Sequence, residues 1–142
     1  MSMIDLKIVT PERVVYKNKV KQITLPTADG EITILPNHRS YIASLETGEM
    51  IAKTENEEEV DLAVAGGFVE FYDNKLVVLA DEAERAEEID LKEAEKARKK
   101  AEELKKKKIT ADDTDYAQVA ATLKREMNRI KVAKRYLKRK GL

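Results

Sequence analysis

Apolar and polar residues alternate along the first half of the chain. Between Met3 and Ala80 the apolar positions recur at every second residue, as in Ile4, Leu6 and Ile8, and turn residues interrupt the pattern at short intervals. A period of two places successive side chains on opposite faces of a strand. The stretch therefore predicts eight or more short strands, with no helix between them, in a sandwich or barrel.

Three short motifs predict how these strands connect. Asp29-Gly30 lies between two strand-like runs, and both residues tolerate a positive φ, which predicts a hairpin turn. Asp73-Asn74 predicts a second tight turn. Gly66-Gly67 lacks the Lys-Ser/Thr of a phosphate-binding loop, so it indicates a bulge or a close backbone approach.

After Ala80 the apolar period changes from two to three and four. Asp90 can cap a helix with Glu93 at the third helical position, in a capping-box arrangement. A stripe rich in alanine follows, and small side chains on it would let another helix approach closely. Its members are Leu91, Ala94, Ala97, Ala101 and Leu104.

A second helix is predicted to begin near Thr110, with Asp113 three residues on, and to stop at Gly141. Its apolar positions repeat at seven (Tyr116, Leu123, Ile130, Leu137), with support from Val119, Ala120, Met127 and Ala133. A short connection predicts an antiparallel pair of helices. The fold class is therefore α+β, an N-terminal antiparallel β-sandwich followed by a C-terminal antiparallel two-helix hairpin.

The charge of the chain is divided unevenly along its length. The net charge is zero, yet residues 123–142 carry nine Lys and Arg against one acid, Glu126. Such a helix could bind nucleic acid, an anionic membrane or an acidic protein. The helix lacks the interleaved aromatic residues that favour nucleic-acid binding. Its Leu and Ile residues have the spacing of a helix that pairs with another helix, which argues against a helix lying on a membrane surface. Arg125 and Arg129 share one helical face and could hold a phosphate or a carboxylate.

Residues for catalysis or metal binding are scarce. The sequence has no cysteine, which excludes disulfides, thiolate metal sites and cysteine nucleophiles. His38 is the single histidine, and we interpret it as a loop or packing residue rather than a ligand. No apolar run approaches the roughly 20 residues of a membrane-spanning helix, and no signal peptide is evident. No catalytic residue, metal site or cofactor is predicted.

The order of several motifs points to a known family. The sandwich contains "IVTPERVVY", "DGEITILPNH" and "VAGGFVEF", and "LADEAERAEEID", an Ala-rich helix and a basic helix with "NRIKVA" follow. Over essentially the whole chain this order resembles the epsilon subunit of bacterial and plastid rotary ATP synthases. The resemblance implies a non-catalytic subunit, with residues 1–85 as a sandwich and residues 86–142 as a regulatory hairpin.

The resemblance also implies partners and a location. In that family the sandwich binds the gamma subunit and touches the membrane rotor ring, which couples rotation to ATP synthesis. The hairpin can extend into the ring of alpha and beta subunits and inhibit ATP hydrolysis, with its basic helix facing an acidic segment of beta. Here Arg125, Arg129, Lys131 and Arg135 would bind that partner. The implied location is the cytoplasmic face of the bacterial cell membrane, where the protein associates with the membrane only through the complex. No nucleic acid is implied as a partner.

Some members of that family bind ATP on the folded hairpin through a motif of Ile or Leu, Asp, two variable residues, Arg and Ala. Ile89, Asp90 and Ala94 match the motif, and Arg125 and Arg129 fall where the second helix would help hold phosphates. Glu93 stands in the place of the motif arginine. A carboxylate there would repel phosphates, so we expect weak or absent ATP binding.

An alternative function is an interaction module, a ligand-binding sandwich with a dimerising or nucleic-acid-binding helical tail.

Overall fold

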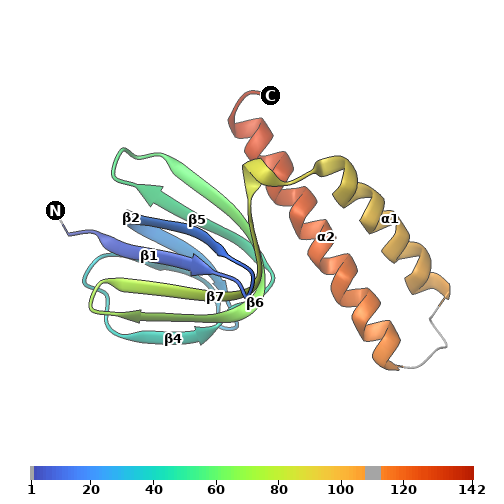
Figure 1. Ribbon diagram of the computed structural model, residues 1–142, viewed down its shortest axis with the longest axis horizontal. Helices are drawn as coiled ribbons and strands as arrows, with labels where there is room; N and C mark the ends of the chain where they lie inside the picture. Colours follow the sequence, from blue (N-terminus) through green and yellow to red (C-terminus); the bar gives the residue numbers. More distant parts are fainter. Residues whose placement is uncertain (1, 108–112) are drawn as a thin grey trace. The chain divides into compact units, whose positions relative to one another are not determined.

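The computed structural model describes residues 2–107 and 113–142. The chain divides into two compact units, Met1–Ala86 and Glu87–Leu142. The first unit is built from strands and the second from helices (Figure 1). The predicted fold class, a β-sandwich followed by a helical hairpin, is confirmed.

The strands of the first unit pair into one continuous network. Along the described chain they are β1 (Ile4–Val9), β2 (Val14–Thr27), β3 (Gly30–Ile34), β4 (Tyr41–Ser44), β5 (Gly48–Thr54), β6 (Glu59–Tyr72) and β7 (Lys75–Arg85). Their order is β1-β7-β6-β5-β2-β3, with β4 beside β6, and β1 at one end of this path also pairs with β2, the strand next to the other end. All pairs are antiparallel except β1 with β7, which is parallel.

The prediction of eight or more short strands is wrong, because two of the seven described strands are 14 residues long. β2 runs from Val14 to Thr27 through a register shift between Val20 and Gln22, where its partner changes from β1 to β5. β6 likewise pairs with β5 along its first half and with β4 along its second. A long strand can serve both layers of a sandwich when it bends at such an irregularity.

The inward-facing residues of these strands form one hydrophobic core. Ile4, Leu6 and Ile8 of β1 are fully buried, as the alternating pattern predicts, and they pack with Phe71 of β6 and Met50 of β5. Burying a large aliphatic or aromatic side chain contributes about 1.5–3 kcal/mol. The sandwich thus has a core of its own, made from side chains of the first unit.

The turn motifs behave largely as predicted. Asp73 and Asn74 both have positive φ, 50° and 59°, and they connect β6 to β7 as a tight turn. In the β2–β3 hairpin Thr27 pairs with Gly30, so the turn itself consists of Ala28 and Asp29, one residue earlier than the predicted pair. A Cβ on Gly67 would lie 2.0 Å from the Leu79 carbonyl oxygen, which confirms a close backbone approach.

The second unit contains helices α1 (Leu91–Lys107) and α2 (Asp113–Arg139), preceded by the short 3-10 helix η1 (Ala86–Glu88). The predicted start at Thr110 lies outside the described residues. α2 ends at Arg139, and Gly141, the predicted stop, lies in the cap just beyond it with a φ of 76°; the Leu142 amide donates to the Leu137 carbonyl over 2.9 Å. This is the hydrogen bond of a Schellman cap.

The two helices run antiparallel, as Figure 1 shows. Ala94 and Ala101 of α1 and Ile130 and Ala133 of α2 are buried, in agreement with the predicted stripes. Met127 is 52% exposed, however, so its place in the stripe was wrong. At 3.6 residues per turn the buried side of α2 continues from Ile130 to the position four residues earlier, Glu126, and Met127 falls on the opposite flank.

Candidate functional site

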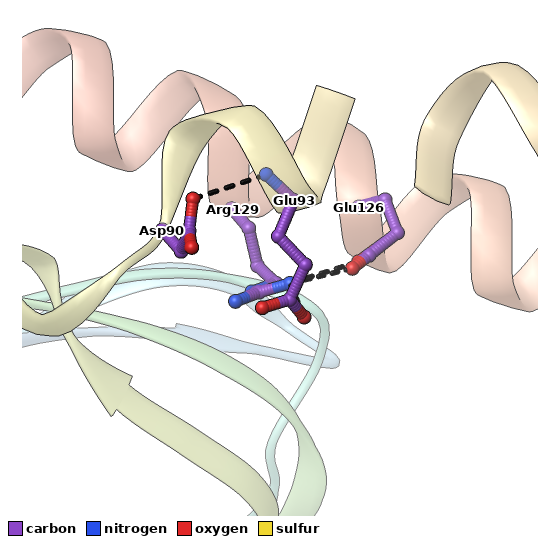
Figure 2. A network of polar contacts seen from close by, with 4 residues as sticks. All are labelled: Asp90, Glu93, Glu126 and Arg129. Carbon is purple, nitrogen blue, oxygen red and sulfur yellow. Dashed lines mark hydrogen bonds and ion pairs between the residues drawn. The ribbon is translucent and has the colours of Figure 1, made fainter. Parts of the chain in front are cut away.

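The N-terminus of α1 is fixed by the capping aspartate that the sequence predicts. The Asp90 carboxylate accepts a hydrogen bond from the Glu93 backbone amide over 3.1 Å, and the Asp90 carbonyl accepts one from the Ala94 amide. Ile89, just before the cap, is half-buried, and Ala94 is fully buried. The cap leaves the Glu93 side chain free to point toward α2 from the first helical turn (Figure 2).

Arg129 of α2 is the centre of a polar network between the helices. Its Nη1 donates to Oε1 of Glu126 over 2.7 Å and to Oε2 over 3.2 Å, and it lies 4.0 Å from Oε1 of Glu93. Figure 2 shows both carboxylates directed at the same guanidinium. The Glu126 side chain is 7% exposed and that of Arg129 17%, whereas that of Glu93 is 68% exposed. We call these three side chains the Arg129 clamp.

The Arg129 clamp contains two carboxylates around one guanidinium, which has a clear electrostatic consequence. Charge-assisted hydrogen bonds to a buried carboxylate are among the stronger polar contacts in proteins. A phosphate approaching Arg129 would have to displace or tolerate Glu126 and Glu93, both negatively charged. The arginine is therefore neutralised mainly by Glu126 of its own helix, with a longer contact to Glu93 of α1, rather than presenting an open cationic surface.

The other predicted residues of α2 differ in exposure. Arg125 is half-buried, and it makes polar contacts of its own. Lys131 and Arg135 are exposed. Lys134 lies 3.7 Å from Glu95 of α1, which adds a second contact between the helices. The structure thus separates the four predicted cations into Arg129, which is engaged by carboxylates, Arg125, which is half-buried, and an exposed pair, Lys131 and Arg135. Their role in binding a partner stays a prediction.

Sequence reasoning missed the role of Glu126. Glu126 was noted only as the single acid in a basic segment. Its position three residues before Arg129 is one at which helical side chains can form an ion pair. The burial of Glu126 could have been recognised from its position four residues before Ile130, on the side of α2 that faces α1. The contact of Glu93 with Arg129 depends on the register of the two helices, which no local motif gives.

The sandwich carries a second candidate surface, on the outward face of β4, β6 and β7. Ile42 is 71% exposed, Phe68 59% and Leu79 55%. Phe68 pairs directly with Leu79 on β7 and with Ser44 on β4, two residues from Ile42. Beside Phe68 and Leu79 is a hollow of about 320 Å³ with Pro11 in its wall. We call Ile42, Phe68 and Leu79 the apolar zone; large apolar side chains exposed together in this way are a feature of protein interaction surfaces.

His38 is a packing residue, as interpreted. Its ring makes edge contacts with Tyr41 and Phe71 at centroid distances of 6.1 and 5.9 Å, and its Nδ1 lies 2.7 Å from the Arg39 carbonyl oxygen. Across residues 2–107 and 113–142, no three His, Asp or Glu side chains are grouped so that they could hold a metal ion. In the same ranges, no helix combines the length and the apolar character needed to cross a bilayer.

Comparisons with known proteins agree with this architecture. The family model "ATP synthase, Delta/Epsilon chain, beta-sandwich domain" matches residues 3–86, and the model "ATP synthase, Delta/Epsilon chain, long alpha-helix domain" matches residues 87–134. A structure of the Euglena gracilis mitochondrial ATP synthase, described as OSCP/F1/c-ring, contains a chain similar in fold. The two chains align with a TM-score of 0.75 and a sequence identity of 23%. The alignment covers 87% of this chain and 77% of the chain in that structure.

Two curated relatives extend the similarity across nearly the whole length. The protein named ATP synthase epsilon chain of Ligilactobacillus salivarius is 40% identical over 134 residues, which cover 94% of this chain and 96% of the relative. The protein of the same name from Levilactobacillus brevis is 44% identical over 135 residues, with coverage of 94% and 96%. The chain belongs to the ATP synthase delta/epsilon chain family.

Proposed function

We propose that this chain is the epsilon subunit of a rotary ATP synthase, a non-catalytic part of the central stalk. Its sandwich would couple rotation of the membrane rotor ring to ATP synthesis, and its hairpin would restrain ATP hydrolysis. The observation that supports the proposal is the division into two compact units, because one domain model of the family matches residues 3–86 of the first unit and another matches residues 87–134 of the second. A two-part subunit can stay bound through one part while the other moves.

The apolar zone is the proposed contact with the gamma subunit. Three large apolar side chains on neighbouring strands stand more than half exposed, and burying what remains exposed of each would contribute about 1–2 kcal/mol. The sandwich has its own core, so this surface does not depend on the hairpin for its shape. The rotor ring would be contacted by the same unit.

The exposed cations of α2 are the proposed inhibitory contact. The Arg129 clamp engages Arg129 mainly with Glu126 of α2, and Lys131 and Arg135 stand outside it at exposed positions. When the hairpin extends, these cations would face an acidic surface of the beta subunit within the ring of alpha and beta subunits. Because exposed ion pairs are screened, inhibition should weaken as salt rises; the screening length is about 10 Å at 0.1 M.

The test of this contact is a triple variant in the reconstituted complex. Arg125, Lys131 and Arg135 are replaced by Ala, and Arg129 is kept because it holds the clamp. ATP hydrolysis should rise, with each contact contributing about 0.2–1 kcal/mol. The matched control replaces Lys92, Lys96 and Lys99, three exposed lysines of α1, and should leave hydrolysis unchanged. Equal effects of the two triple variants would refute a specific role for α2.

ATP is proposed to bind the isolated protein weakly or not at all. Glu93 stands where the resembling ATP-binding members have arginine, and its carboxylate lies 4.0 Å from Arg129. Ile89, Asp90, Ala94 and Arg125 remain as candidate nucleotide contacts.

The proposed localisation follows from membership of the complex: the subunit would lie on the cytoplasmic face of the bacterial cell membrane as a peripheral component.

A further inference from the structure

Lysines gather on the outward face of β1, β2 and β7, next to the apolar zone, since Val77 lies two residues before Leu79 on β7. Lys7 of β1 lies opposite Lys17 of β2 and opposite Val77 of β7. In the neighbouring row Asp5 lies between Lys19 and Lys75. Residues two apart on a strand share a face, so all six side chains project from the same side of the sheet. We call this set the lysine hollow: Asp5, Lys7, Lys17, Lys19, Lys75 and Val77.

The charge of the lysine hollow is strongly unbalanced. It holds four cations and one anion, and Asp5 lies 4.0 Å from Lys19. Lys7 and Lys17 are direct cross-strand neighbours, an arrangement that brings Cβ atoms within about 4.5–5.5 Å and is destabilising for like charges. Within the described part of the chain, no carboxylate forms an ion pair with either lysine. A bound anion would relieve this repulsion.

The shape of the surface suits a small anion. The lysine hollow has a volume of about 610 Å³, within the range of roughly 300–1,000 Å³ of ligand sites. Val77 provides an apolar patch in the lining, and lysine stems bury their methylene groups on such surfaces while the ammonium groups reach outward. Several ammonium groups can therefore converge on one group of oxygen atoms above the sheet.

We propose that the lysine hollow binds a phosphate-bearing anion, either a soluble phosphate compound or the headgroup of an anionic lipid. Lysine binds phosphate as a point charge, and several flexible lysines suit an anion whose charge is spread over several oxygens. An acidic protein segment is the weaker match, because lysine is depleted at protein interfaces whereas lysine clusters attract anionic lipid surfaces. The site is independent of the proposed rotor function.

The test uses the full chain and two probes. In the first arm, pyrophosphate is added at constant ionic strength and the melting temperature is measured; a ligand that binds the folded state raises it. In the second arm, sedimentation is measured with vesicles of phosphatidylcholine alone or mixed with phosphatidylglycerol. The site variant is Lys7→Gln/Lys17→Gln. The control is Lys99→Gln/Lys100→Gln, which also removes two positive charges, but at exposed positions of α1.

The unmodified chain and the control should respond to at least one probe, and the site variant should not. For the mixed vesicles we expect a loss of about fivefold per lysine, or about 25-fold for the pair. Pyrophosphate stabilisation identifies a soluble ligand, and vesicle binding alone identifies a lipid headgroup. No response to either probe, or an equal loss in the control, would overturn the proposal. The site variant should itself fold, since it removes a like-charge pair, and its melting temperature without ligand checks this.

Discussion

Replacing Arg129 by Met tests whether the Arg129 clamp stabilises the hairpin. The change leaves the Glu126 carboxylate, which is 7% exposed, without the guanidinium that binds both its oxygens. Removing one partner of a fully buried pair costs about 3–5 kcal/mol; for this part-buried pair we expect a lower cost of about 1–3 kcal/mol, because the remaining carboxylate loses its partner next to partly accessible water. That is a large fraction of the roughly 5–15 kcal/mol that stabilises a typical domain. We expect α1 and α2 to unfold at markedly lower denaturant concentration, measured by far-ultraviolet circular dichroism.

Two further variants separate this mechanism from a general loss of charge. Glu93→Gln removes a contact of 4.0 Å to a carboxylate that is 68% exposed, so it should cost only about 0.2–1 kcal/mol. Arg129→Met combined with Glu126→Leu removes both members of the ion pair, including the buried Glu126 carboxylate, and should recover most of the lost stability. If Arg129→Met is no more harmful than Glu93→Gln, or if the double variant is worse than the single one, the reasoning about the clamp fails.

Two more predictions concern individual carboxylates. Lys21 donates a hydrogen bond to Glu57 and lowers its pKa below the ordinary 4.5, mainly through that bond and through the charge of Lys21, with Lys53 contributing. A depressed folded pKa contributes stability that is present above the unfolded pKa and lost as pH falls through the folded one. Glu57→Gln should therefore lower the melting temperature at neutral pH and have no effect in acid; a pH-independent difference would contradict this. Glu93→Arg removes a carboxylate that repels the phosphates of ATP. If this repulsion is worth about 1 kcal/mol, the Kd for ATP measured by calorimetry should fall by about fivefold or more. Tight binding by the unmodified chain, or no gain in the variant, would refute it.

Features set by neighbouring residues could be predicted from the sequence. Asp90 caps α1 because a carboxylate three residues before an amide reaches it in any helix start. Asp73-Asn74 forms a tight turn, and Gly141 ends α2, because these residues adopt positive φ easily. Alternation along β1 gave its buried face correctly.

Features set by contacts between distant segments could not be predicted in this way. The parallel pairing of β1 with β7 joins residues about 70 positions apart, such as Leu6 and Leu76, and no turn motif specifies it. The number of strands was wrong because β2 and β6 continue through irregularities that look like interruptions in the sequence. The Arg129 clamp depends on the register between α1 and α2. The lysine hollow emerges only once β1 lies between β2 and β7.

The central claim is that the sandwich binds the complex and the hairpin restrains it. The most direct measurement is on a chain that ends after Glu88, assembled with gamma and the remaining subunits. Because residues 1–86 form a compact unit with its own core, this chain should fold, co-purify with gamma and raise ATP hydrolysis. Phe68→Glu in the same truncated chain should abolish co-purification by placing a charge in the apolar zone. Loss of gamma binding on truncation alone, or hydrolysis unchanged in the assembled complex, would contradict the account.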